Sequence, residues 1–151
     1  MADRLSCPSA HPKYNGTTVI GVVGKRDGVT RVSMLPKALP LEAVAGLIPE
    51  TVPITEVLRL GGSCVEHRCS NFENGRCSLA SRIVARLPEV EDRLFPCALR
   101  PTCVWWNQEG PAACRRCPQI VTEPFRASAM MHEVAVPPAQ PATPAAESDG
   151  V

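Results

Sequence analysis

Cysteine content constrains this chain more than any other feature of its sequence. Eight of the 151 residues are cysteines, and they form one isolated thiol and two groups. Cys7 is isolated, the first group is Cys64-x4-Cys69-x7-Cys77, and the second group is Cys97-x5-Cys103-x10-Cys114-x2-Cys117. The chain also has 16 prolines but only three phenylalanines, two tryptophans and one tyrosine. A small core this poor in aromatic side chains needs a further source of stability, which the thiols are able to supply.

The redox state of these thiols depends on the cellular compartment. The N-terminal sequence lacks the basic stretch followed by about 7 to 15 apolar residues that marks a secretory signal peptide. No run of about 18 apolar residues, the minimum for a membrane-spanning helix, occurs anywhere. We therefore expect a cytoplasmic protein that does not contact a membrane. In a reducing cytoplasm, clustered thiols are more often metal ligands or redox groups than disulfides.

The second cysteine group is sufficient for a complete centre by itself. Four thiolates satisfy either one tetrahedral zinc ion or the four irons of a [4Fe–4S] cluster. Structural zinc sites usually have two close cysteine pairs, whereas this group has one, Cys114-x2-Cys117, with wider gaps elsewhere. The Cys117-Pro118 step also resembles the Cys-Pro that ends the cysteine runs of bacterial ferredoxins. We expect an iron–sulfur cluster bound by Cys97, Cys103, Cys114 and Cys117, with zinc as the alternative.

The first group has three thiols and needs a fourth ligand. Asn74-Gly75 is a tight-turn sequence, which predicts that Cys77 returns toward Cys64 and Cys69. Cys7 is our choice of fourth ligand because a second metal centre of Cys64, Cys69, Cys77 and Cys7 then uses every cysteine. His11 and His67 are the alternatives.

The remaining sequence predicts a small α+β fold with an irregular, metal-bound cysteine-rich half. Alternating β-branched residues predict a hairpin of residues 17–23 and 29–34 around the turn at 25–28. Short helices are expected over 41–47 and 55–60, and a helix capped by Ser78 carries an apolar stripe that faces the hairpin and ends before Pro88. An edge strand is expected at 119–122. The predicted organisation is 1–63 for the hairpin and short helices, 64–126 for the cysteine-rich region, and 127–151 for a disordered Pro/Ala-rich tail.

Aromatic and basic residues surround the second cysteine group in the sequence. We expect one of Trp105 and Trp106 to fill the small core and the other to be partly exposed. An indole beside a cluster also limits solvent access to it. The side chains of Arg100, Arg115 and Arg116 are expected to offset the negative charge of the thiolates.

These features favour a non-enzymatic protein over an enzyme. The chain has three histidines and no nucleotide-binding loop, paired carboxylates or Ser-His-Asp set. Thiol–disulfide exchange by Cys114-x2-Cys117 is the weakest hypothesis because no βαβ unit surrounds it. A net charge of +1 makes nucleic acid an unexpected partner. The sequence predicts an iron–sulfur protein for electron transfer, redox sensing or an accessory role with another protein, and a zinc-stabilised interaction module is the alternative.

Overall fold

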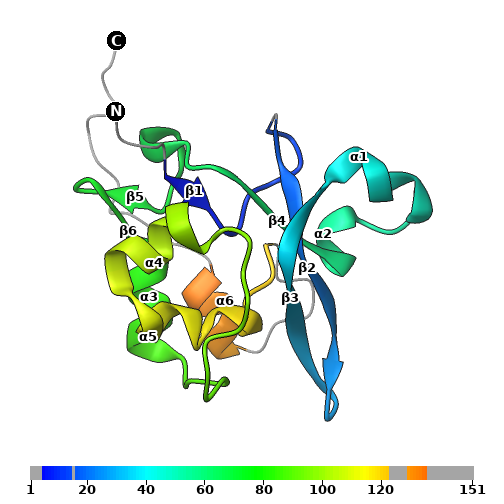
Figure 1. Ribbon diagram of the computed structural model, residues 1–151. Coiled ribbons are helices and arrows are strands. Elements are labelled where there is room, and N and C mark those ends of the chain that lie inside the picture. The colour runs from blue at the N-terminus through cyan, green and yellow to red at the C-terminus, as the bar shows by residue number, and fades with distance from the viewer. Residues whose placement is uncertain (1–4, 15, 123–128, 136–151) are drawn as a thin grey trace.

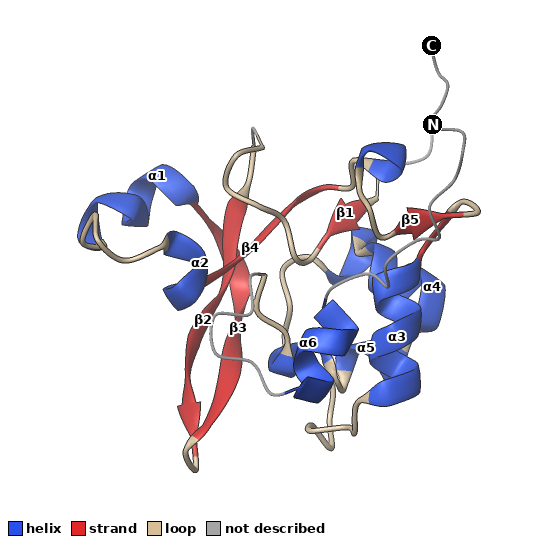
Figure 2. Ribbon diagram, turned by 180° about the vertical axis from the view of Figure 1, so that it is seen from behind, coloured by secondary structure: helices blue, strands red, loops and turns tan. Residues whose placement is uncertain are grey.

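The long strands of the protein form a layer between two sets of helices (Figures 1 and 2). This architecture comes from a computed structural model that describes residues 5–14, 16–122 and 129–135. Helices α1 and α2 lie on one side of the strands, and α3 to α6 lie on the other. The predicted small α+β class with a hairpin and short helices is confirmed.

The main sheet is antiparallel, with the strand order β1-β4-β2-β3. Its strands are β1 (Ser6–Cys7), β2 (Thr18–Arg26), β3 (Val29–Pro40) and β4 (Leu58–Ser63). The predicted hairpin is therefore confirmed, and its strands are longer than the sequence predicted. Its turn residues, Asp27 and Gly28, have φ angles of 54° and 78°, the positive values that a type I′ turn requires.

A second, shorter hairpin follows the sheet in the sequence. It consists of β5 (Phe72–Glu73) and β6 (Arg76–Cys77), joined through Asn74 and Gly75 with φ angles of 54° and 76°. The Asn-Gly turn brings Cys77 back alongside Phe72, as its sequence predicted.

Helices are short throughout the described part of the chain. They are α1 (Leu41–Val44), α2 (Ile54–Val57), α3 (Ser78–Arg86), α4 (Val104–Glu109), α5 (Pro111–Cys114) and α6 (Ala129–Ala135). Single 3-10 turns are η1 (Ala45–Leu47), η2 (Glu66–Arg68), η3 (Arg100–Thr102) and η4 (Cys117–Gln119). Helices of this length are marginal in isolation, so tertiary contacts must stabilise them.

The apolar residues form two separate clusters. One lies beside α1 and α2 and is centred on Val19, Leu58 and Leu60. The other lies among α3, α4, α5 and α6 and contains Ile83 and Trp105. Trp105 is buried and Trp106 is partly exposed, which confirms the expected division between the two tryptophans.

Helix α3 lies where the sequence predicted it, but its packing partners and its N-cap differ from the prediction. Its stripe packs against α4, α5 and α6, with Met34 of β3 at the edge of the cluster, rather than against the hairpin as a whole. The hydroxyl of Ser78 does not cap the helix. It donates instead to the carbonyl of Asn71, and Cys77 occupies the N-cap position.

Two other predicted elements are wrong. The helix expected over 55–60 ends at Val57, and the chain continues as strand β4 because Leu58 to Gly61 pair with β2. The edge strand expected at 119–122 is absent, and η4 occupies its beginning. In both segments long-range contacts outweigh the local preference.

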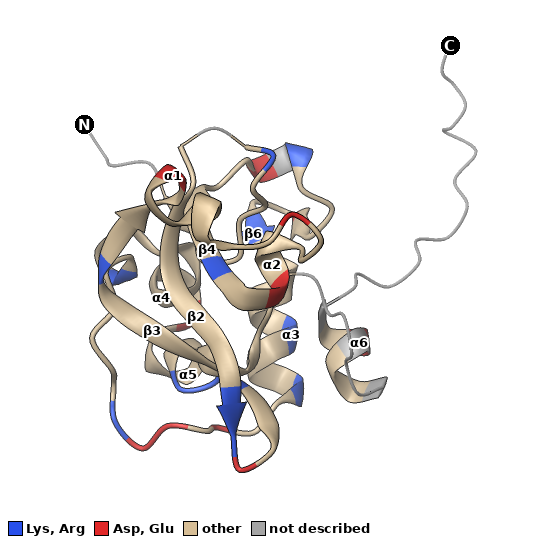
Figure 3. Ribbon diagram, turned by 90° about the vertical axis from the view of Figure 1, so that its right-hand side faces the viewer, with Lys and Arg blue, Asp and Glu red and all other residues tan. Residues whose placement is uncertain are grey.

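The predicted tail is described only in part. Residues 129–135 form α6, which packs against α3, and the other residues of 127–151 lie outside the described residues. None of the helices in the described ranges is long and apolar enough to cross a membrane. Basic and acidic segments are interspersed along the ribbon in Figure 3, consistent with the nearly balanced composition.

Candidate metal or cluster site

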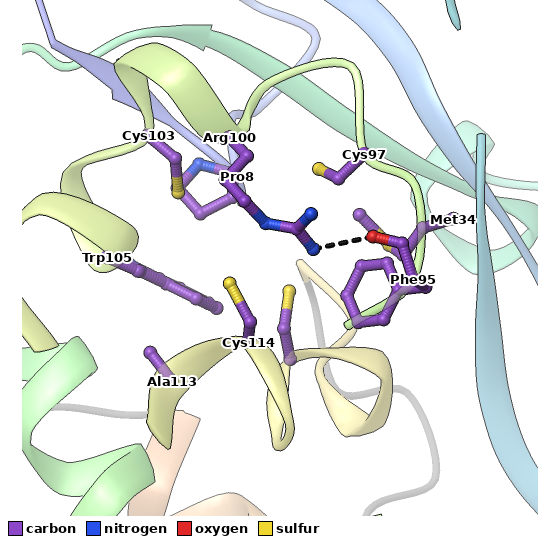
Figure 4. A pocket seen from close by; sticks show the side chains of 10 residues that line it. Pro8, Met34, Phe95, Cys97, Arg100, Cys103, Trp105, Ala113 and Cys114 are labelled. Carbon is purple, nitrogen blue, oxygen red and sulfur yellow. Dashed lines mark hydrogen bonds between the residues drawn. The ribbon is translucent and has the colours of Figure 1, made fainter. Parts of the chain in front are cut away.

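The structure brings all four cysteines of the second group to one cavity between the sheet and α4–α5. Cys103 precedes α4, Cys114 ends α5, and Cys117 begins η4. Cys97 reaches the cavity from the irregular segment before η3. Figure 4 shows the sulfur atoms of Cys97, Cys103 and Cys114 around this space. None of the eight cysteines forms a disulfide.

Arg59 is an unusual residue beside this cavity, where it contacts Cys117 and Trp105. It lies on β4, is fully buried, and stacks on Trp105 with 5.3 Å between the guanidinium carbon and the ring centroid. Its Nη2 donates to Cys117 Sγ at 2.9 Å. The other donors bond to backbone carbonyls at 2.6, 2.8 and 3.0 Å, which belong to Pro8, Cys117 and Ile120.

No carboxylate in the described ranges forms an ion pair with Arg59. Burying a guanidinium cation without a negative partner is costly. Carbonyl groups satisfy its donors but do not neutralise its charge. The sulfur of Cys117 is the acceptor at this site that becomes negative when it loses its proton, so the charge of Arg59 is suited to a thiolate or to a thiolate-bound centre.

Arg100 supplies a second positive charge. Its guanidinium lies 5.2 Å from the Phe95 ring and 5.5 Å from the Trp106 ring, and it donates to the Phe95 carbonyl at 2.7 Å. Figure 4 shows this guanidinium extending into the space among the cysteines. The remaining free volume is about 10 Å³, close to the minimum for one water molecule. A cluster is larger, so its binding requires the Arg100 side chain to withdraw from this space.

Burial favours the neutral form of three thiols of this site, those of Cys103, Cys114 and Cys117. It raises the pKa of Cys103 to about 12, against a smaller opposing effect of the Trp106 N–H. Burial also raises the pKa of Cys114 and of Cys117, and the nearby guanidiniums of Arg100 and Arg59 oppose these changes. The site is therefore arranged so that an incoming cation displaces the thiol protons.

The first cysteine group forms a second collection of thiols, and Cys7 belongs to it. Strand β1 pairs with β4 so that Cys7 lies opposite Gly62, and the Cys64 N–H donates to the Leu5 carbonyl at 3.0 Å. The β5–β6 hairpin places Cys77 beside Phe72, whose N–H donates to the Cys69 carbonyl.

The electrostatics of Cys7 agree with this arrangement. Burial raises its pKa to about 12, and the thiols of Cys77, Cys64 and Cys69 add to the increase. Cys7 Sγ also accepts the Ser9 N–H at 3.4 Å. Cys69 Sγ accepts the Asn71 N–H at the same distance. Hydrogen bonds from the backbone to sulfur are characteristic of the surroundings of metal-bound thiolates.

The structure describes the side chain of only one of the two alternative histidine ligands, His11. The ring of His11 accepts the Lys13 N–H on Nδ1 at 3.1 Å. The side chain of His67, in η2, lies outside the described part of the structure. The choice between Cys7 and these histidines as a metal ligand stays a prediction.

Sulfur spacing bears on the size of the centre. One zinc ion with Zn–S bonds of about 2.3 Å would hold its sulfurs roughly 3.8 Å apart. Within residues 5–14, 16–122 and 129–135, no three Cys, His, Asp or Glu side chains are placed to hold a single metal ion. The described ranges therefore contain no preformed mononuclear site, and metal ligation by either cysteine group stays a prediction.

Two residues that connect the cavity to the sheet, Arg59 and Pro8, were not predicted from the sequence. Arg59 lies in a segment that the sequence predicted to be helical, and Pro8 is far from the second cysteine group in the chain. The available signal was a single charged residue between leucines in Leu58-Arg59-Leu60, which fits a buried strand with one special polar side chain. Arg116 was expected to offset the charge of the thiolates. It instead bonds to the Leu87 and Ala112 carbonyls and pairs with Glu89.

Comparisons with protein-family models, curated proteins and solved structures found no match for this chain. The chemistry of the site is therefore the basis for assigning a function.

Metal binding at the thiols is expected to release protons. Because burial raises the pKa of Cys103 and of Cys7 to about 12, these thiols are protonated at neutral pH and lose their protons when a metal binds. Metal affinity should consequently fall as the pH is lowered. Titration of metal-free protein with Zn²⁺ in weak buffer containing an indicator dye should release about four protons per ion.

The same titration checks the ligand set. With Cys7→Ser, the site of Cys64, Cys69 and Cys77 should release about one proton fewer. A release of about two protons per ion in the unaltered protein would contradict sites made of four thiolates.

Proposed function

We propose that this chain binds a [4Fe–4S] cluster through Cys97, Cys103, Cys114 and Cys117, and a second metal centre through Cys64, Cys69, Cys77 and Cys7. In this proposal it is a small cytoplasmic redox protein rather than an enzyme. It exchanges electrons with another protein or reports the oxidation state of its cluster to that protein.

The observation that carries the proposal is the buried guanidinium of Arg59 bonded to Cys117 Sγ at 2.9 Å. A [4Fe–4S] core in its oxidised state, bound by four thiolates, has a net charge of about −2. Arg100 lines this cavity and Arg59 lies beside it, bonded to Cys117, so the two guanidiniums together carry the opposite charge. These cations lower the cost of collecting negative charge in a site shielded from solvent.

A zinc ion bound by four thiolates would carry the same net charge, so charge does not separate the two centres. In the described ranges no three ligating side chains are placed to hold one ion, which argues against a preformed zinc site but is not evidence for a cluster. The wide gaps between the cysteines in the sequence are what favour the cluster. A cluster brings its own sulfides and spans a wider set of thiolates than a single ion. Burial and the neighbouring indoles limit the access of water, which favours redox cycling over hydrolysis of the cluster.

The test is anaerobic purification of the full chain, with iron and sulfide analysis and visible absorption before and after dithionite. We expect a brown protein whose absorption bleaches on reduction. Cys114→Ser should lose most of the iron of this site, whereas Ala112→Ser, a partly exposed position on the same helix, should retain it. A colourless protein with stoichiometric zinc would contradict the cluster proposal and support the alternative, a zinc-stabilised interaction module.

Voltammetry of the brown protein separates carrier from sensor. A carrier should give reversible waves and keep its iron in air. Rapid loss of iron in air would indicate a sensor.

A further inference from the structure

The two cysteine groups are neighbours in space although they are separate in the sequence. Ser6 of β1 forms a parallel bridge with Cys103, and its hydroxyl hydrogen-bonds that of Thr102 at 2.8 Å. Bridged backbones lie about 4.8 Å apart. Ser6 therefore lies one strand spacing from the backbone of Cys103, and Cys7 of the first site is the next residue along the chain.

The next residue crosses the boundary between the groups. Pro8 lines the cavity of Cys97, Cys103, Cys114 and Cys117, and its carbonyl accepts the Arg59 Nε–H at 2.6 Å. The peptide bond between Cys7 and Pro8 therefore joins a thiol of one group to the wall of the other.

Helix α4 makes a second connection. The Trp105 ring lines the cavity of the second group and is buried. Its Nε1 has no hydrogen bond of standard geometry in the described residues, yet it lies near the Cys77 thiol of the first group. Gln108, on the same helix, bonds to both the N–H and the carbonyl of Cys77 at 2.9 Å.

We infer that each cysteine group holds an iron–sulfur cluster, and that the two clusters exchange electrons across the Cys7-Pro8 peptide and the Trp105 indole. This inference rests on the proposed function and extends it to a paired redox centre. Tunnelling weakens steeply with distance, and the groups are separated here by one backbone strand and one aromatic ring. In each exchange the reduced cluster loses one electron and the oxidised cluster gains it, without making or breaking a bond.

The difference in solvent exposure between the two cysteine groups suggests which cluster receives an electron from outside the protein. All four cysteines of the first site, Cys7 included, are partly exposed, whereas the second group has three buried cysteines and one, Cys97, that is partly exposed. A one-electron donor protein therefore reaches the first group more closely, and the second group receives the electron inside the protein.

Electron paramagnetic resonance tests this arrangement because magnetic interaction between two reduced clusters requires them to be close. The full chain is reconstituted anaerobically with ferrous iron and sulfide and reduced with excess dithionite. We expect about eight irons per chain, as two [4Fe–4S] clusters require, and a broadened spectrum. Cys77→Ser and Cys114→Ser should each give the narrower spectrum of one isolated cluster, whereas Ala112→Ser keeps the broadening. If Cys77→Ser yields no soluble protein, Cys69→Ser removes the same site.

The outcomes separate this inference from the proposed function. A spectrum equal to the sum of the two single-cluster variants would overturn the paired arrangement and leave the proposed function standing. About four irons per chain, lost in Cys114→Ser, would do the same. A chain that takes up no iron would overturn both.

Discussion

Removal of the metal from the loaded protein is expected to unfold the cysteine-rich half while the β2–β3 hairpin remains folded. The elements around the second group are six residues or fewer, namely α4, α5, η3 and η4. Helices of fewer than about 12 residues are marginal without tertiary support. Structural zinc commonly supplies about 10 to 16 kcal/mol of folding free energy, and we expect a similar scale for this centre.

Amide hydrogen exchange measures this result. After anaerobic treatment with chelator, amides of α3 and α4 should lose most of their protection, whereas amides of β2 around Val19 should keep theirs, because that strand packs in the separate cluster with Leu58 and Leu60. Reloading the centre should restore the lost protection. Unchanged protection in α3 and α4 after complete loss of metal would show that the centre does not stabilise this half.

Local signals in the sequence accounted for the elements that local chemistry determines. The β2–β3 hairpin follows from β-branched strands and an Asp27-Gly28 turn, and α3 follows from an apolar stripe ended by Pro88. The same reasoning explains the β5–β6 hairpin, whose Asn-Gly turn returns Cys77 toward Cys69. Grouping the cysteines by spacing also selected the sets that the structure brings together.

Long-range contacts account for the elements that could not be predicted. Strand β4 exists because it pairs with both β1 and β2. The Leu58-Arg59-Leu60 pattern is compatible with a strand but does not indicate these partners. Arg59 is interpretable only when Pro8 and Cys117 are known to lie beside it. Proximity of the two cysteine groups likewise depends on the bridge between Ser6 and Cys103, far apart in the sequence.

Replacement of Arg59 by methionine is expected to destabilise the protein by about 3–5 kcal/mol, because it leaves buried acceptors without a donor and removes the bonds that join the sheet to the cysteine-rich half. The carbonyls of Pro8, Cys117 and Ile120 lose their donor. Methionine keeps much of the packing against Trp105, so the loss reports mainly the polar contacts. Urea unfolding of the loaded protein measures the change.

Arg26→Met is the matched control. Arg26 lies on the neighbouring strand β2, has 57% of its side chain exposed, and pairs with Glu91 at 3.4 Å. Its loss should cost less than about 1 kcal/mol.

Arg59→Lys keeps the charge but lacks the planar set of donors that serves four acceptors, so its stability should be intermediate. In Arg59→Met protein that retains iron, loss of the cation and of the bond to Cys117 Sγ should also lower the cluster's reduction potential. Reduced stability with an unchanged potential would show that Arg59 only joins the two halves, and it would remove the main argument for an anionic centre beside it.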